Sequence, residues 1–122
     1  MSEVYSFKSV LEQGGNLFGS NVCIDAVLII RGGEAYLVEA VDFPESLHRI
    51  YIHSPGLELQ LDLAVGGWMG GAYSYLDPVR IAGKLEMGTV RKNRFSISDV
   101  TEITLTRDDE SIRVLLNKDF RG

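Results

Sequence analysis

The most constraining feature of the sequence is a pair of apolar segments, residues 22–30 and 34–38, separated by Gly32-Gly33. Apolar residues alternate along the first segment, as in a strand with one covered face. Two glycines tolerate the positive φ angles that a two-residue hairpin turn requires. With this turn, the facing pairs are Arg31 and Glu34, Ile29 and Tyr36, Leu28 and Leu37, and Val27 and Val38. A slip of one residue would separate these matched pairs, so the sequence predicts an antiparallel hairpin in this register.

A second hairpin is predicted near the end of the chain, where residues 101–107 and 110–116 flank Asp108-Asp109. Its facing pairs are Leu105 and Ile112, Ile103 and Val114, and Arg107 and Glu110. Further strands are predicted over residues 48–53, 78–87 and 95–97, bounded by glycine, proline or polar segments. The chain is therefore expected to be mainly β.

One short helix is predicted over residues 6–13, where Phe7, Val10 and Leu11 recur at helical spacing. Gly14-Gly15 follows this segment, and a glycine in the left-handed conformation commonly ends a helix. We therefore expect a left-handed cap at this glycine pair.

Leucine alternates with polar residues over residues 57–65, which leaves two structures open. The strict period of two favours a strand with one face toward water. A helix is the alternative, because Ser54 and Pro55 suit its N-cap and its first residue. The strand is the preferred interpretation.

Residues 22–28 and 79–85 share the pattern Val-x-Ile-x-small-x-Leu, with Ala26 and Gly83 at the small position. A strand that bends around a small barrel needs a bulge or a close backbone approach at such a residue. We therefore predict a mainly β fold: a small OB-like barrel or a strongly curved antiparallel sheet, with one short N-terminal helix. Its core is expected to contain Leu28, Leu37, Ile81, Leu85 and Ile103.

The length of 122 residues suits a single domain, residues 1–122, with one core. Within it we expect an N-terminal helix and cap over residues 1–15. A β-barrel core should follow over residues 16–116, and a polar tail over residues 117–122.

Seventeen acidic and twelve basic residues give the chain a formal charge of −5. This field repels phosphate groups, so nucleic acid is an unlikely partner and a basic protein is a better candidate. The basic cluster at residues 91–94 has no interleaved aromatic residue for base stacking and is interpreted as a solvated turn. Most acidic residues in the middle of the chain are interpreted as the wet sides of strands: Asp42, Glu45, Glu58, Asp62 and Asp77.

The sequence contains no evident catalytic or metal-binding set. His48 and His53 lie five residues apart in a predicted strand and should point to opposite faces. The single cysteine, Cys23, permits neither an internal disulfide nor a multi-thiolate zinc site, which suits a reducing cytoplasm. Neither an export signal nor an apolar run of membrane length is visible. We therefore expect no metal, no cofactor, no membrane contact and no enzymatic activity.

Residues 66–75 combine four glycines with three large aromatic residues, which suits neither a regular helix nor a regular strand. The segment does not match a phosphate-binding loop, because no lysine follows its last glycine. Aromatic residues and methionine bury much area in protein contacts. The predicted binding residues are Trp68, Met69, Tyr73 and Tyr75. In the alternative interpretation, Trp68 plugs one end of the barrel.

Five features follow one another along residues 17–107: the strand and Gly-Gly turn of residues 22–40, Pro55-Gly56-Leu57, Gly70-Gly71, the strand of residues 79–85 and the segment of residues 95–105. In these features the chain resembles small bacterial OB-fold-like proteins, some of which are thought to be immunity-type binding proteins. The resemblance implies a non-catalytic protein-binding module of the immunity or accessory kind. The alternatives are an OB-type binder of single-stranded nucleic acid or oligosaccharide, and a small metal-dependent enzyme.

Overall fold

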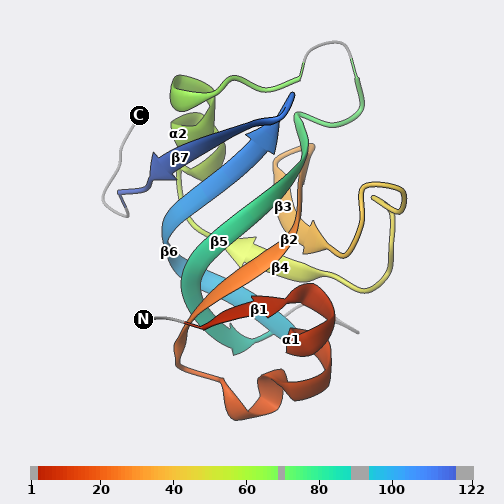
Figure 1. The fold of residues 1–122 in the computed structure, drawn as a ribbon, viewed down its shortest axis with the longest axis vertical. Helices are drawn as coiled ribbons and strands as arrows, with labels where there is room; N and C mark the ends of the chain where they lie inside the picture. The colour runs from red at the N-terminus through yellow and green to blue at the C-terminus, as the bar shows by residue number, and fades with distance from the viewer. Residues whose placement is uncertain (1–2, 69–70, 89–93, 118–122) are drawn as a thin grey trace.

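The computed structural model describes residues 3–68, 71–88 and 94–117 (Figure 1). In chain order its elements are β1 (Val4–Ser6), α1 (Phe7–Gln13), the 3₁₀ helix η1 (Gly14–Asn16), β2 (Asn21–Arg31), β3 (Glu34–Val38), β4 (Ile50–His53), α2 (Leu57–Ala64), β5 (Tyr75–Met87), β6 (Phe95–Arg107) and β7 (Glu110–Leu115). The protein is mainly β, as predicted.

Five strands close into a barrel in the order β2-β3-β4-β6-β5, and β5 pairs with β2 to complete the ring. The pairing of β4 with β6 is parallel, and the other pairings in the ring are antiparallel. Outside the ring, β1 pairs with β2 and β7 pairs with β6. The predicted fold class is confirmed: this is a small closed β-barrel, consistent with an OB-like fold.

Both predicted hairpins are confirmed in register. In the first, Gly32 and Gly33 have φ angles of 58° and 86°. In the second, Asp108 and Asp109 have φ angles of 53° and 65°, a conformation that aspartate tolerates better than most residues. The facing pairs run from Arg31 and Glu34 to Val27 and Val38, and from Arg107 and Glu110 to Ile103 and Val114.

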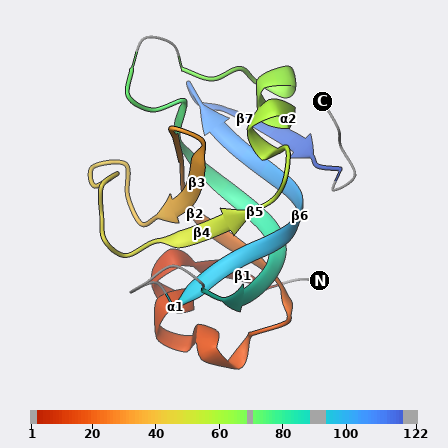
Figure 2. The ribbon, with the colours of Figure 1, turned by 180° about the vertical axis from the view of Figure 1, so that it is seen from behind.

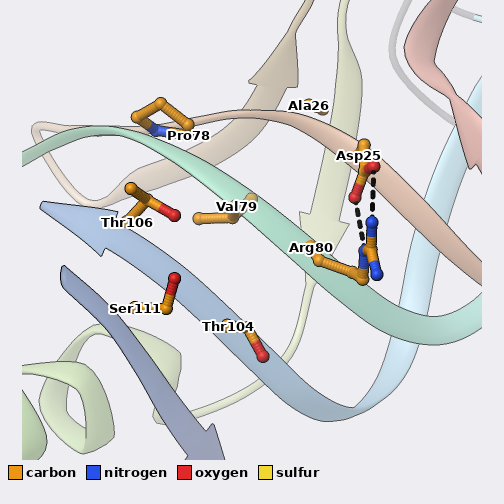
Figure 3. Close-up of a pocket in the computed structure, with 8 residues that line it drawn as sticks. All are labelled: Asp25, Ala26, Pro78, Val79, Arg80, Thr104, Thr106 and Ser111. Atoms are coloured by element: carbon orange, nitrogen blue, oxygen red, sulfur yellow. Dashed lines mark hydrogen bonds and ion pairs between the residues drawn. The ribbon is translucent and has the colours of Figure 1, made fainter. Parts of the chain in front are cut away.

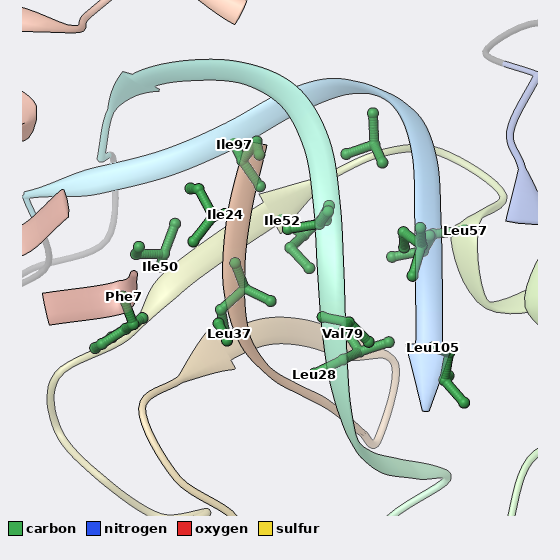
Figure 4. Packing of buried hydrophobic residues seen from close by; sticks show 14 of the residues in the cluster. Phe7, Ile24, Leu28, Leu37, Ile50, Ile52, Leu57, Val79, Ile97 and Leu105 are labelled. Carbon is green, nitrogen blue, oxygen red and sulfur yellow. The ribbon is translucent and has the colours of Figure 1, made fainter. Parts of the chain in front are cut away.

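Apolar side chains fill the interior of the barrel (Figure 4). The residues predicted for the core are completely buried: Leu28, Leu37, Ile81, Leu85 and Ile103. At one end of the barrel, α1 adds Phe7 and Val10 to this cluster, and at the opposite end α2 adds Leu57 and Leu61 (Figures 1 and 2). The barrel interior therefore serves as a packed core.

The two segments that share a sequence pattern lie side by side, antiparallel, in β2 and β5. Their facing pairs are Val22 and Gly83, Ile24 and Ile81, and Ala26 and Val79. The register of β5 against β6 shifts at Gly83, and a Cβ atom at this position would lie 2.9 Å from the carbonyl oxygen of Ser98. The close backbone approach predicted from the pattern is confirmed at Gly83.

The strand predicted over residues 57–65 is wrong, because this segment forms α2. Leu57 and Leu61 lie one helical turn apart and are buried, whereas Leu63 is 73% exposed. The open end of the barrel accepts one face of a helix, and this tertiary contact outweighs the alternating pattern.

Two helix caps also differ from the predictions. Gly14 has a φ of −63° and leads into η1, so it is not left-handed. Glycine is required at this position for another reason: a Cβ atom there would lie 2.6 Å from the ring of Phe95, which is too close for any side chain. At α2 the N-cap is Gly56, with a φ of 76°, and not the Ser54 of the helical alternative.

The predicted strands at residues 95–97 and 101–107 are two halves of one strand, β6. Asp99 lies between them with a φ of 48°. Here β6 bends opposite the irregularity at Gly83, so the strand changes direction without ending.

A second, smaller apolar cluster lies outside the barrel wall, on the outward-facing positions of β2 and β3. Its buried members are Val27, Ile29, Tyr36 and Val38, and Tyr51, Tyr73 and Leu76 pack against them. We call this group the outer cluster. Because its side chains point away from the barrel core, another segment of the chain must cover them.

Candidate interaction surface

The outer cluster is covered by the β3–β4 loop, residues 39–49. The Tyr36 hydroxyl donates a hydrogen bond to the carbonyl oxygen of Pro44 at 3.3 Å. The Arg49 guanidinium lies 4.2 Å from the centre of the Tyr36 ring, and its Nε donates to the carbonyl oxygen of Ser46 at 2.7 Å. The loop is thus held against Tyr36 by Pro44 in its middle and by Arg49 at its end.

A polar cluster around Glu45 fixes the middle of the β3–β4 loop. The Glu45 carboxylate accepts hydrogen bonds from Arg31 and Tyr73, and Arg49 lies 3.5 Å away. The hydrogen bond from Tyr73 is the main cause of the lowered pKa of the Glu45 carboxyl. The positive charges of Arg31 and Arg49 lower this pKa further. We call these four residues the Glu45 cluster. It joins the loop to the first hairpin and to the glycine-rich segment.

Large apolar side chains project from the loop into solvent. Phe43 is 70% exposed, Leu47 is 76% exposed and Val41 is also exposed. Apolar side chains of this size are common in cores, and large exposed apolar patches mark contact sites, so a loop that exposes three of them is a candidate contact site. We call these three residues the 41–47 surface.

The charges beside the 41–47 surface are acidic. Glu39 and Asp42 are both exposed, whereas Arg31 and Arg49 pair with Glu45. The apolar side chains are therefore flanked by carboxylates, which would favour a partner with basic residues around an apolar pocket.

The structure places the predicted binding residues in two groups. Tyr73 belongs to the Glu45 cluster, while the Arg107 guanidinium lies against the rings of both Trp68 and Tyr75. Tyr75 is completely buried, and its hydroxyl donates a 2.8 Å hydrogen bond to Asp62, so it supports the segment from below. Met69 lies outside the described residues, as do residues 91–93 of the basic cluster and residues 118–122 of the predicted tail.

Trp68 does not plug the barrel. Its side chain is 47% exposed, and one face of the ring lies 4.2 Å from the Arg107 guanidinium. Its indole N–H points between the two carboxylate oxygens of Asp77, each 3.2 Å away. Trp68 is therefore a surface residue held in one orientation.

Asp77 is buried, which corrects its interpretation as the wet side of a strand. It is 2% exposed and accepts two hydrogen bonds from Arg107, at 3.1 and 2.8 Å. These hydrogen bonds are the main reason that the pKa of the Arg107 guanidinium is raised. Arg107 also donates to the carbonyl oxygen of Gly66 at 2.7 Å, so the pair fixes the start of the glycine-rich segment.

A shallow depression of about 470 Å³ lies on the outer face of the sheet (Figure 3). Its lining residues are Asp25, Ala26, Pro78, Val79, Arg80, Thr104, Thr106 and Ser111. Arg80 and Asp25 form a two-point ion pair across it, at 2.7 and 3.0 Å. The charged groups of this depression neutralise each other.

Within the described residues, neither histidine belongs to a group of side chains that could bind a metal ion. Both His48 and His53 are exposed, at the start and the end of the segment that contains β4. Among the described residues, no group of three or more histidine, cysteine or acidic side chains is placed to hold a metal ion.

The sequence analysis did not single out Phe43 and Leu47, which lie in the connection between the strands predicted at residues 34–38 and 48–53. One signal was present in residues 27–30, where four apolar residues follow one another. Such a run indicates a strand covered on both faces. A second covering segment was therefore predictable, although its identity was not.

Comparisons with protein-family models, with curated proteins and with solved structures give no match to this chain. Within the residues that the structure describes, no helix is long and apolar enough to cross a membrane.

Proposed function

We propose that this protein is a non-catalytic binding module that recognises a basic protein through the 41–47 surface, as an immunity-type or accessory protein would. The observation that carries this proposal is the exposure of Phe43 and Leu47 on a loop that the Glu45 cluster holds in place. A fixed apolar surface binds at a lower entropic cost than a flexible one.

The charge distribution supports a basic partner. The chain carries a formal charge of −5, and Glu39 and Asp42 flank the apolar side chains. Opposite charge around an apolar centre speeds association and fixes orientation. The expected partner presents an apolar pocket rimmed by lysine or arginine.

An OB-type binder of nucleic acid or oligosaccharide is a less supported alternative. Such proteins bind on the face of their second and third barrel strands, which correspond here to β3 and β4. In this chain the β3–β4 loop covers Tyr36 on that face, and Arg49 stacks on its ring. The aromatic surface that would stack on bases is therefore already occupied.

The test is affinity capture from extract of the producing cells, followed by titration with each purified captured protein. The variant F43A/L47A removes the main part of the proposed surface, and Leu63→Ala is the matched control, because Leu63 is equally exposed on α2. The double variant should weaken binding about 30-fold or more, as expected for a contact worth about 2 kcal/mol. Leu63→Ala should bind as wild type does. Equal binding by F43A/L47A and wild type would refute the proposed surface.

A further inference from the structure

The last strand leaves one edge of the sheet unpaired. β7 pairs with β6 along its whole length, from Arg107 opposite Glu110 to Glu102 opposite Leu115. No other described strand pairs with it. Within the described residues, the sheet therefore has an unpaired edge next to the closed barrel.

The register shows which backbone groups of β7 face outward. The backbone N–H of Leu116 donates to the carbonyl oxygen of Thr101 at 2.9 Å, so the backbone N–H and C=O groups of Leu116 point toward β6. Backbone groups alternate in direction along an antiparallel strand. Those of Ser111, Arg113 and Leu115 therefore point away from β6, and none of them has a hydrogen-bond partner in the described part of the chain.

The fold itself already uses the next outward position of this edge. The side-chain amide of Gln60, on α2, donates to the carbonyl oxygen of Asn117 at 3.1 Å and accepts from its backbone N–H at 2.8 Å. These are the two hydrogen bonds that a residue of a neighbouring strand would make. The edge thus carries strand-like pairing at Asn117, and no described residue pairs with it from Ser111 to Leu115.

Two features that usually protect an edge strand are missing from β7. Natural edges carry proline, bulges or charged side chains. β7 contains no proline and pairs without a register shift, and the charge of its exposed Arg113 side chain is paired with Glu102 on β6. Leu115 is 68% exposed.

We propose that the edge of β7 accepts an extended segment of a partner protein as an additional strand. This mode of recognition uses backbone hydrogen bonds for affinity and side-chain positions for selectivity. Leu115 favours an apolar residue at the facing position. Asp108, Asp109 and Glu110 at the turn favour lysine or arginine at the end of the segment that lies beside them. The inference rests on the proposed function only in requiring a protein partner, since the 41–47 surface lies elsewhere on the chain.

The test isolates one outward N–H group. Arg113→Pro removes this donor without breaking the β6–β7 ladder, because the Arg113 N–H points away from β6. Arg113→Ala is the matched control, since it removes the same side chain and its ion pair with Glu102 but keeps the N–H. Both variants and F43A/L47A are compared with wild type for binding of peptides selected on wild type from a random phage-displayed library.

The selected peptides should alternate apolar residues and carry basic residues at one end. Arg113→Pro should weaken their binding about tenfold or more, whereas Arg113→Ala and F43A/L47A should bind as wild type does. Binding should also slow hydrogen exchange at the amides of Ser111, Arg113 and Leu115. A library that yields no peptide bound more tightly by wild type than by Arg113→Pro overturns the proposal. If sedimentation shows a wild-type dimer that Arg113→Pro dissociates, a second copy occupies the edge, and the assignment to a partner segment is wrong.

Discussion

Arg107 and Asp77 form a buried two-point ion pair between β6 and β5, with N···O distances of 3.1 and 2.8 Å. The same guanidinium stacks on Trp68 and donates to the carbonyl oxygen of Gly66. One arginine therefore fixes the start of the glycine-rich segment to the barrel.

Replacement of Arg107 by methionine should lower the free energy of unfolding by about 3–5 kcal/mol, because it leaves the Asp77 carboxylate buried without its cation. Urea denaturation measures this loss, and Trp68 fluorescence should shift toward the spectrum of a solvated indole. The control is Arg80→Met, which breaks the exposed pair with Asp25 and should leave stability nearly unchanged. Equal effects of the two variants would contradict the account of the buried pair.

The Glu45 cluster should loosen in acid. The pKa of Glu45 is lowered from 4.5, chiefly by Tyr73, so its stabilising contacts are complete above pH 4.5 and are lost as the pH falls through the lower folded value. NMR titration of the Glu45 carboxyl carbon should show this lowered midpoint. In Tyr73→Phe the midpoint should move up toward 4.5, because the main hydrogen bond is gone. An unchanged midpoint in that variant would mean that Tyr73 does not contact Glu45 in solution.

Gly83→Ala should destabilise the barrel by about 1–3 kcal/mol, because the new methyl group would meet the Ser98 carbonyl oxygen at 2.9 Å and the Ile97 side chain at 3.0 Å. Gly71→Ala is the matched control, since its added methyl group would lie 4.0 Å from the backbone nitrogen of Tyr73, an ordinary contact distance. Thermal denaturation of the two variants provides the comparison. A similar melting temperature for both would show that β5 does not approach β6 closely at Gly83.

Leucine replacements distinguish the helix α2 from the strand that the sequence pattern favours. Leu61→Ala should cost about 2–5 kcal/mol, since Leu61 is completely buried. Leu63→Ala should change stability by less than about 0.5 kcal/mol. In a strand, Leu61 and Leu63 would share one face and the two losses would be alike. Chemical denaturation of both variants decides between these outcomes.

The hairpins were predictable because their information is local. Gly32-Gly33 and Asp108-Asp109 fix the turns, and the alternation of flanking residues fixes the register. The barrel followed from the same alternation and from the repeated small residue, which marks the close approach at Gly83.

The leucine segment and the candidate surface were less predictable, because tertiary contacts decide both. Leu57 and Leu61 satisfy a strand pattern and a helix pattern equally, and the end of the barrel selects the helix. The exposure of Phe43 depends on where the β3–β4 loop lies, and this depends on the contacts of Glu45 with distant residues. No local pattern encodes such contacts.

The central claim is that Phe43 and Leu47 are presented on a loop with a fixed conformation. Backbone ¹⁵N relaxation of the free protein tests it most directly, with the amides of β2 as the internal reference. The account predicts order parameters of about 0.85 at Phe43 and Leu47, as in the strands. Values below about 0.6 would contradict it, because the loop would then move freely despite the Glu45 cluster.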